Sequence, residues 1–212
     1  VEGGDELLGR ERLRVDFERF PVGNVPHTMG AFAPLDCNPG RPGQVTIVDA
    51  DPAQGRRALR FADAPDLKPN WTPIVTAKCG VEAGTAKLAF ALKVEGGATP
   101  TVELRDYSGD GAYTVGARLG VQKGRFTANG RDVCAARPGV WHDVALALPL
   151  SGPRTGRWSL TVTPRDGTPV RTEFASFLDA RFKALTWIGF ICYGATSSVW
   201  YLDDLRLDTE RE

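Results

Sequence analysis

The chain has 212 residues, of which 42% are hydrophobic and 25% charged, a composition typical of globular rather than disordered proteins. Lysine plus arginine and aspartate plus glutamate each total 26, so the formal net charge is zero. This balance argues against a nucleic-acid or anionic-membrane binder, because such proteins need a basic surplus. No apolar run approaches the roughly 18 residues of a membrane-spanning helix, so we expect no membrane insertion.

The N-terminal quarter of the chain combines one strand signal with long irregular stretches. Residues 1–11 are charged and glycine-rich, so we expect a peripheral segment with at most one helical turn. Apolar residues alternate over 13–17, which predicts the first strand. Residues 24–44 contain repeated prolines and glycines and are predicted to form a long surface loop.

The rest of the chain alternates short apolar runs with turn signals such as Asn129-Gly130 and Asp166-Gly167. The runs lie at residues 45–49, 57–62, 73–79, 86–94, 101–106, 112–121, 124–128, 139–148, 156–163, 184–193 and 198–207. One short helix is predicted over 173–180. About a dozen short strands with little helix predict an all-β chain, a two-sheet antiparallel sandwich of the jelly-roll type. We expect a single domain over residues 1–212.

The alternation predicts which side chains are buried. In the run 87–94, one set of alternate residues should face the core and the other should face out. The inward set is Leu88, Phe90, Leu92 and Val94, and the outward set is Lys87, Ala89, Ala91 and Lys93. Trp141, Trp158 and Trp187 each lie in a strand of apolar period, so we place all three in the core.

The cysteines suggest no metal site. Cys37, Cys79, Cys134 and Cys192 form no CxxC pair, which argues against a zinc or thioredoxin-like site. Four cysteines permit two disulfides in three connectivities, but Cys192 also fits a small buried apolar group. The chain begins at Val1, for which a cleaved signal peptide and excision from a longer protein are both open explanations.

Several C-terminal segments carry a family resemblance. They are Pro138–Val144, Gly156–Val162, Leu185–Phe190 and Val199–Leu207. With the opening Asp16-Phe17-Glu18, this series resembles the concanavalin A-like, laminin-G-like jelly rolls of bacterial carbohydrate-active proteins. It is also similar to jelly-roll carbohydrate-binding modules, whose last strand often reads aromatic-apolar-Asp-Asp. The resemblance implies the sandwich fold and a secreted or cell-surface bacterial protein.

The resemblance also implies that the first and last strands lie side by side, where related modules often hold a structural calcium. Asp203 shares the strand parity of Leu205 and should point inward, and a buried carboxylate needs a cation or hydrogen-bond donors. Glu18 could reach the same place. We therefore predict Glu18 and Asp203 as calcium ligands, with Asp16 and Asp204 as further candidates.

The alternative to calcium is a structural role for Asp203. In that interpretation its carboxylate accepts backbone N–H bonds or pairs with an arginine such as Arg14 or Arg19.

The sequence offers little evidence of catalysis. His27 lies in the proline-rich loop and His142 at a strand start, and no GxSxG motif supports a hydrolytic triad. The Glu-x-Asp-x-x-Glu strand of related glycosidases is absent. Arg171-Thr172-Glu173 matches the Arg-x-Glu strand of alginate-lyase-like members, but no Gln-x-His strand accompanies it. An enzyme with an unrecognised active site stays an alternative.

Sugar binding has better candidates. Sugar sites in β-sandwiches combine exposed aromatic rings with polar side chains for the hydroxyl groups. The candidate binding residues are Trp71, Arg105, Tyr107, Tyr113 and Arg118, although each also fits a merely solvated or packed residue. The leading hypothesis is a monomeric, non-catalytic carbohydrate-binding or accessory module with a polysaccharide or glycan partner. A glycoside hydrolase or polysaccharide lyase and a structural or adhesion domain are the alternatives.

Overall fold

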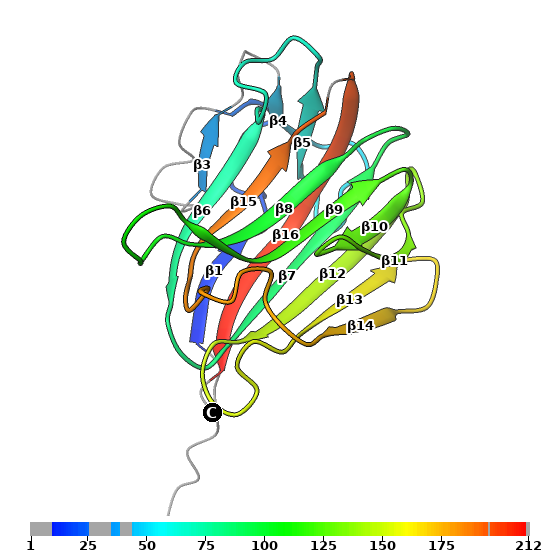
Figure 1. Ribbon diagram of the computed structural model, residues 1–212. Coiled ribbons are helices and arrows are strands. Elements are labelled where there is room, and N and C mark those ends of the chain that lie inside the picture. The colour runs from blue at the N-terminus through cyan, green and yellow to red at the C-terminus, as the bar shows by residue number, and fades with distance from the viewer. Residues whose placement is uncertain (1–9, 26–34, 39–43, 195, 211–212) are drawn as a thin grey trace, which may run out of the picture.

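The computed structural model describes residues 10–25, 35–38, 44–194 and 196–210, with the backbone alone for residues 24 and 35–38. The described residues form two antiparallel β-sheets packed face to face, with no helix among them (Figure 1). No helix in this part of the chain could cross a membrane. The predicted all-β sandwich of the jelly-roll type is confirmed.

Sheet A is nine-stranded, in the order β14-β13-β12-β7-β16-β5-β4-β2 with β1 paired to β16. Its strands are β1 (Arg10–Val15), β2 (Gly23–Asn24), β4 (Val45–Val48), β5 (Ala58–Asp63), β7 (Thr85–Val94), β12 (Trp141–Pro149), β13 (Trp158–Pro164), β14 (Val170–Phe174) and β16 (Ser198–Glu210).

Sheet B is seven-stranded, in the order β11-β10-β9-β8-β15-β6-β3. Its strands are β3 (Leu35–Asn38), β6 (Ile74–Val81), β8 (Pro100–Asp106), β9 (Thr114–Gln122), β10 (Arg125–Ala128), β11 (Arg131–Ala135) and β15 (Leu185–Cys192).

Most strands lie within a few residues of the predicted runs, with four differences. β3 and the second residue of β2 fall in the stretch 24–44 predicted as a loop, and β11 and β14 were not predicted. The helix predicted over 173–180 is wrong, because Glu173 belongs to β14 and the chain then turns along β9. There the backbone N–H groups of Leu178 and Asp179 donate to the carbonyls of Gly116 and Val115. Residues 1–9, including most of the predicted helical turn, lie outside the described part.

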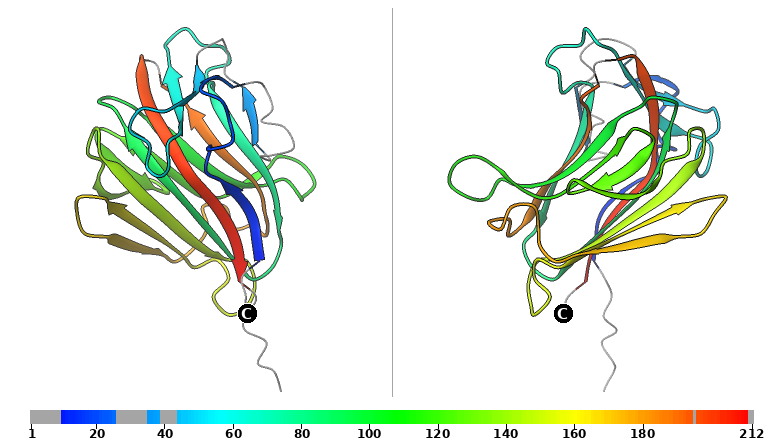
Figure 2. Two further views of the ribbon diagram at one scale, coloured as in Figure 1. Left: turned by 180° about the vertical axis from the view of Figure 1, so that it is seen from behind. Right: turned by 45° about the vertical axis from the view of Figure 1, so that its right-hand side comes forward.

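The two ends of the chain pair as predicted. β1 runs antiparallel to β16, with Val15 opposite Leu205 and Leu13 opposite Leu207. β16 also pairs with β5 and β7, so it joins the two halves of sheet A (Figure 2).

Aromatic contacts fill the space between the sheets. Phe90 of sheet A meets Phe190 of sheet B edge to face at 5.4 Å between ring centroids, and Phe61 stacks on Trp200 at 3.8 Å. Leu88, Phe90, Leu92 and Val94 are buried in the core as predicted. Trp158 also lies in the core, where it stacks on Phe174 at 4.0 Å.

A β-bulge in β16 changes the predicted orientation of Asp203. The register shifts between Asp203 and Arg206, and Asp204 has a positive φ of 48°. The bulge breaks the parity that the prediction assumed. Asp203 therefore does not share the inward side of Leu205. Instead its fully buried carboxylate accepts N–H bonds from Ala53 and Gln54 of the β4–β5 loop, at 2.9 and 3.0 Å.

The β4–β5 loop, residues 49–57, is fixed against the outer face of sheet A. Lys93 donates to the Asp51 carboxylate at 2.8 Å and lies over the rings of Trp141 and Tyr201. Trp141 Nε1 donates to the Asp51 carbonyl at 3.0 Å. Trp141 is thus buried beneath this loop and not in the central core, and Lys93 and its neighbour Ala91 are buried although they face outward.

The described cysteines are free thiols. Cys192 is buried in the core and accepts an N–H bond from Trp200 Nε1 at 3.1 Å. Burial raises the pKa of the Cys79 thiol to about 12, so this thiol stays protonated at neutral pH. Cys134 is half-buried, and the side chain of Cys37 lies outside the described residues.

Asp203 predicts a pH dependence of stability. Burial raises its pKa from 3.8 to about 6, against the lowering effect of the N–H donors of Gln54, Asp204 and Ala53. Between these values the folded chain binds a proton that the unfolded chain does not. The contribution of Asp203 to the free energy of unfolding therefore falls as pH rises through this window, by on the order of 2 kcal/mol.

The test compares urea unfolding of the wild type with Asp203→Asn across this pH range. We expect the difference between their unfolding free energies to fall with rising pH and to level off above about pH 6. A difference that stays constant, or rises, contradicts the raised pKa. Both proteins contain buried Asp63, so its titration largely cancels in the difference between their unfolding free energies.

Candidate functional site

The outer face of sheet B carries two of the predicted binding residues, Arg105 and Arg118, on neighbouring strands. Lys78 on β6 lies opposite Trp187 on β15, which lies opposite Arg105 on β8. The next row across the same strands contains Thr76, Gly189, Glu103 and Arg118. Adjacent strands lie about 4.8 Å apart, so each row brings its side chains within contact range.

A buried carboxylate organises the centre of this face. Glu103 is 2% exposed and holds two guanidinium groups, one on each carboxylate oxygen. Its Oε2 accepts from Arg105 Nε at 2.8 Å and its Oε1 accepts from Arg118 Nε at 2.7 Å. Because a buried carboxylate needs such partners, Glu103 fixes both arginines in place.

Arg105 is also enclosed by aromatic rings. Its guanidinium carbon lies 4.0 Å from the Tyr113 ring centroid and 4.3 Å from that of Trp187, and Nη1 donates to the Tyr107 hydroxyl at 3.0 Å. Trp187 therefore lies on the outer face, a correction to its predicted place in the core. The indole covers Gly189, and any Cβ at that position would overlap the ring. Arg105 is 9% exposed, and its guanidinium is held by Glu103, Tyr107, Tyr113 and Trp187.

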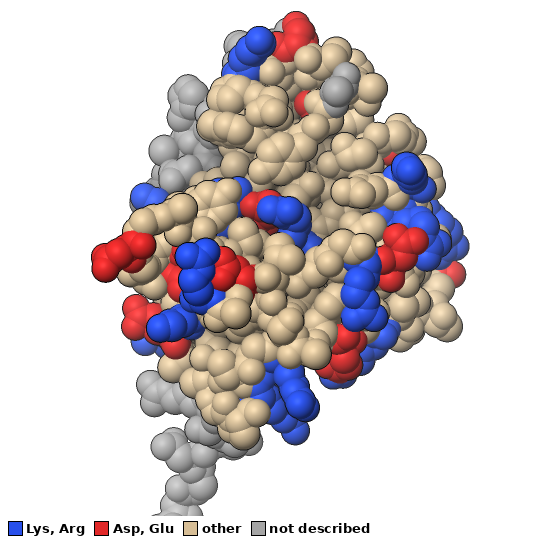
Figure 3. Space-filling view, viewed as in Figure 1, with Lys and Arg blue, Asp and Glu red and all other residues tan. Residues whose placement is uncertain are grey.

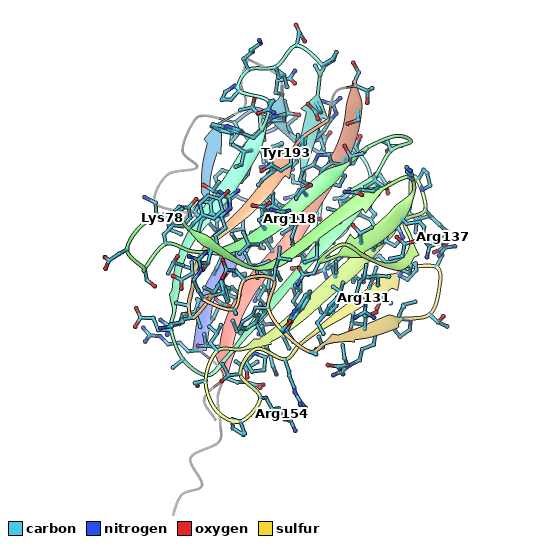
Figure 4. All side chains as sticks on the ribbon, viewed as in Figure 1. Lys78, Arg118, Arg131, Arg137, Arg154 and Tyr193 are labelled. Atoms are coloured by element: carbon cyan, nitrogen blue, oxygen red, sulfur yellow. The ribbon has the colours of Figure 1, made fainter. Side chains whose placement is uncertain are left out.

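Arg118 is the arginine available to a ligand. Its side chain is 52% exposed and its Nε donates to Glu103, while its terminal Nη atoms make no hydrogen bond to another described residue. Figure 4 labels Arg118 near the centre of this face, where Figure 3 shows a basic side chain beside an acidic one. The outward positions of β6, β8, β9 and β15 carry three cations, Lys78, Arg105 and Arg118, and one carboxylate, Glu103. The centre of the face is therefore positively charged.

Tyr193 joins this face and was missed from the sequence. It follows directly after β15 and is 44% exposed. Burial raises the pKa of its phenol, and the negative charge of Glu103 acts in the same direction while Arg105 and Arg118 oppose it. The phenol thus stays protonated at neutral pH and can donate a hydrogen bond. The continuation of strand parity from Trp187 through Gly189 could have identified it.

Two segments project from the outer face and border the site. They are the β8–β9 loop, which carries Tyr107 and Tyr113, and the segment 175–184 (Figure 2). Asp106 fixes the second segment by accepting N–H bonds from Lys183 and Ala184 at 3.2 and 3.0 Å. Burial alone would raise the pKa of Asp106, but these bonds and those from Ser108 lower it.

The predicted residue Trp71 is placed differently from the others. It is 39% exposed and lies in a turn between two cis prolines, Pro69 and Pro73. The carbonyl of Pro73 accepts an N–H bond from Cys192, so this turn is anchored next to the strand end that carries Tyr193. No ring contact joins Trp71 to the Arg105 cluster among the described residues.

The predicted calcium ligands lie elsewhere, at the β4–β5 loop. Glu18 Oε1 accepts backbone N–H bonds from Arg56 and Arg57 at 2.7 and 2.9 Å, as Asp203 does from Ala53 and Gln54. Donor hydrogens directed at a carboxylate oxygen occupy the position that a cation would need. In the described part, no group of three or more His, Cys, Asp or Glu could hold a metal ion. Calcium binding stays a prediction, and the N–H groups that donate to Glu18 and Asp203 do not favour it.

The remaining sequence candidates do not converge on this face. Arg171 and Glu173 pair with each other on β14, at the edge of sheet A. His142 is fully buried against Phe126, and burial lowers its pKa, so it is neutral at physiological pH. His27 lies outside the described residues.

No protein-family model and no curated protein sequence matches this chain. Solved structures do match. A variant of the alginate lyase Aly36B bound to an alginate trisaccharide has a TM-score of 0.63 at 12% identity, covering 95% of this chain and 99% of its own. An alginate lyase from Aplysia kurodai has a TM-score of 0.62 at 10% identity, covering 89% and 97%. Peanut lectin has a TM-score of 0.52 at 8% identity, covering 89% and 97%. The chain therefore has the concanavalin A-like jelly-roll fold, which includes both polysaccharide lyases and lectins.

Proposed function

We propose that this domain binds an acidic polysaccharide on the outer face of sheet B, as a carbohydrate-binding module of a secreted or cell-surface protein. The observation that carries the proposal is Arg118, whose guanidinium is fixed by buried Glu103 and whose Nη atoms make no hydrogen bond to another described residue. A guanidinium presented in this way can form two parallel hydrogen bonds with a sugar carboxylate.

The surroundings of Arg118 suit a sugar. The half-exposed rings of Tyr107, Tyr113 and Tyr193 offer apolar surface for sugar faces and hydroxyl groups for hydrogen bonds. In the row next to Arg118, β8 and β9 carry small residues, Thr101 and Gly120. The two alginate lyases share the fold, which supports a carboxylate-bearing glycan as the partner.

A polysaccharide lyase is the second candidate, favoured by Tyr193. In an elimination, a base removes the proton next to the uronate carboxylate, the bond from the sugar ring carbon to the glycosidic oxygen breaks, and that oxygen takes up a proton. Tyr193, neutral at physiological pH, is a candidate for that final proton donation, and Arg118 for neutralising the uronate.

A hydrolase that uses two carboxylates has less support. Glu103 is the one carboxylate at an outward position of the described strands β6, β8, β9 and β15, and it is bound to both arginines. A glycosidase needs a second acidic group across the sugar.

Replacing Arg118 tests the binding proposal. Arg118→Ala should weaken binding of alginate or polyglucuronate about 10- to 100-fold, because it removes charge-assisted hydrogen bonds worth ~1.5–3 kcal/mol. Arg118→Lys should recover only part of the affinity, since lysine cannot bind in a bidentate manner. Isothermal titration calorimetry with defined oligosaccharides measures both effects.

A matched control lies on the same sheet. Arg125 on β10 is 46% exposed and bonds one carboxylate, Asp132, through Nε at 2.8 Å, as Arg118 bonds Glu103. Arg125→Ala should leave binding unchanged. Equal losses in both variants, or no acidic glycan bound by the wild type, would refute the proposal.

Product formation separates the two candidate functions. A lyase releases unsaturated uronate, which absorbs ultraviolet light, whereas a binding module releases none. We expect no product from alginate or polyglucuronate with the wild type. Turnover that is lost in Tyr193→Phe but kept in Tyr107→Phe would instead establish the lyase.

A further inference from the structure

The outer face of sheet A carries an open groove. This face lies on the opposite side of the sandwich from the outer face of sheet B (Figure 2). Two adjoining depressions of about 870 and 760 Å³ share Lys87, Ala147, Ser159, Arg171 and Glu210 among their lining residues. The β4–β5 loop covers another part of this face, at Lys93 and Trp141, so the groove occupies a part of the sheet that this loop leaves open.

The strand register places small residues across the floor and arginines at both sides. Read across the sheet from β1 to β14, one row contains Arg14, Arg206, Ala89, Ala145, Thr161 and Arg171. Four strand spacings of about 4.8 Å separate the backbones of Arg206 and Arg171, or roughly 19 Å. A flat ligand segment on this floor could thus meet arginines on either side.

The lining has an excess of positive charge. It contains five cations and three carboxylates, and each carboxylate already has a partner: Glu210 with Lys87, Glu173 with Arg171, and Asp208 with Arg206. Arg154 and Arg157, in the β12–β13 loop, have no ion-pair partner among the described residues. Figure 4 labels Arg154 on this loop. Arg14 is the direct cross-strand neighbour of Arg206, so the row across the groove continues to a further cation beyond the Arg206–Asp208 pair.

The existing ion pairs can be exchanged at little cost. In the Lys87–Glu210 and Arg171–Glu173 pairs all four side chains are 45–68% exposed. Exposed pairs of this kind contribute little stability, so an incoming anion can replace the carboxylate. The lining offers no exposed aromatic ring in its described part, since Trp158 is 1% exposed, so a neutral sugar or a nucleic-acid base would find no stacking surface.

We propose that this groove is a second binding site, for a polyanionic polysaccharide held by charge through Arg154, Arg157 and the arginines of β14 and β16. Recognition here depends on sulfate or carboxylate groups and not on ring stacking. The site is independent of Arg118 and does not require the function proposed for sheet B.

The experiment measures binding of dextran sulfate, alginate and uncharged dextran to the immobilised wild-type domain by biolayer interferometry. We expect dextran sulfate to bind with an affinity that falls as salt is raised, and uncharged dextran not to bind. Alginate binding that persists in Arg118→Ala would show that the groove also accepts carboxylate groups. Failure of dextran sulfate to bind the wild type at low salt overturns the proposal.

Variants then locate the site. Arg154→Ala/Arg157→Ala should lower affinity for dextran sulfate about tenfold or more, because two charged contacts are removed. The matched control Lys123→Ala/Lys183→Ala removes two exposed cations outside the groove and should bind like the wild type. Arg118→Ala should keep dextran sulfate binding, which separates this site from the one on sheet B.

Each of three results with the variants would overturn the proposal. They are unchanged dextran sulfate affinity in Arg154→Ala/Arg157→Ala, an equal loss of that affinity in Lys123→Ala/Lys183→Ala, and loss of dextran sulfate binding in Arg118→Ala. Analytical ultracentrifugation tests whether a second copy of the chain occupies the groove instead. If the wild type forms a dimer that cannot bind dextran sulfate, and Arg154→Ala/Arg157→Ala abolishes that dimer, the groove is an interface between two copies and the proposal is wrong.

Discussion

The pairing of β16 with three other strands is the interaction on which this sandwich depends. β16 contacts β1, β5 and β7, and so connects the start, the middle and the end of the chain within sheet A. Without it β5, β4 and β2 would have no neighbour linking them to β7 and β12. The bulge at Asp203 and Asp204 lets this strand also fix the β4–β5 loop, so one element sets both the core face and part of the outer face of the sheet.

The polar outer surface of sheet B depends on a buried carboxylate and its two arginines. Glu103 is desolvated but lies between two guanidinium groups, and the rings of Tyr113 and Trp187 cover the inner one. Burying this much charge is stable only because every member has a partner. The same arrangement directs the outer guanidinium, Arg118, toward solvent. Rigid placement of this kind reduces the ordering cost of binding a ligand group.

Period-two alternation predicted most of the fold because it reports burial directly, as in Leu88 to Val94. The pairing of the two chain ends followed from the family resemblance instead. Of the candidate binding residues, Arg105 contacts Tyr107 and Tyr113 and shares Glu103 with Arg118. Alternation could not predict how Arg105 is held, since that depends on a neighbour from β15. Trp141 and Trp187 were placed in the core because periodicity does not reveal a loop or a cation that covers an outward ring. Asp203 was misoriented because its parity was counted back from Leu205 alone, whereas the spacing of three between buried Leu202 and Leu205 marks the bulge.

The indole of Trp187 lies over Gly189 and against the Arg105 guanidinium, which makes it a fluorophore built into the floor of the candidate site. Trp158 and Trp200 are buried in the interior and Trp141 is covered by a loop, so of the other tryptophans it is Trp71, 39% exposed, that adds a surface signal to that of Trp187. An anion that changes the field around Glu103 and its arginines alters the surroundings of Trp187 first. The domain thus carries its own optical reporter of occupancy, without any added label.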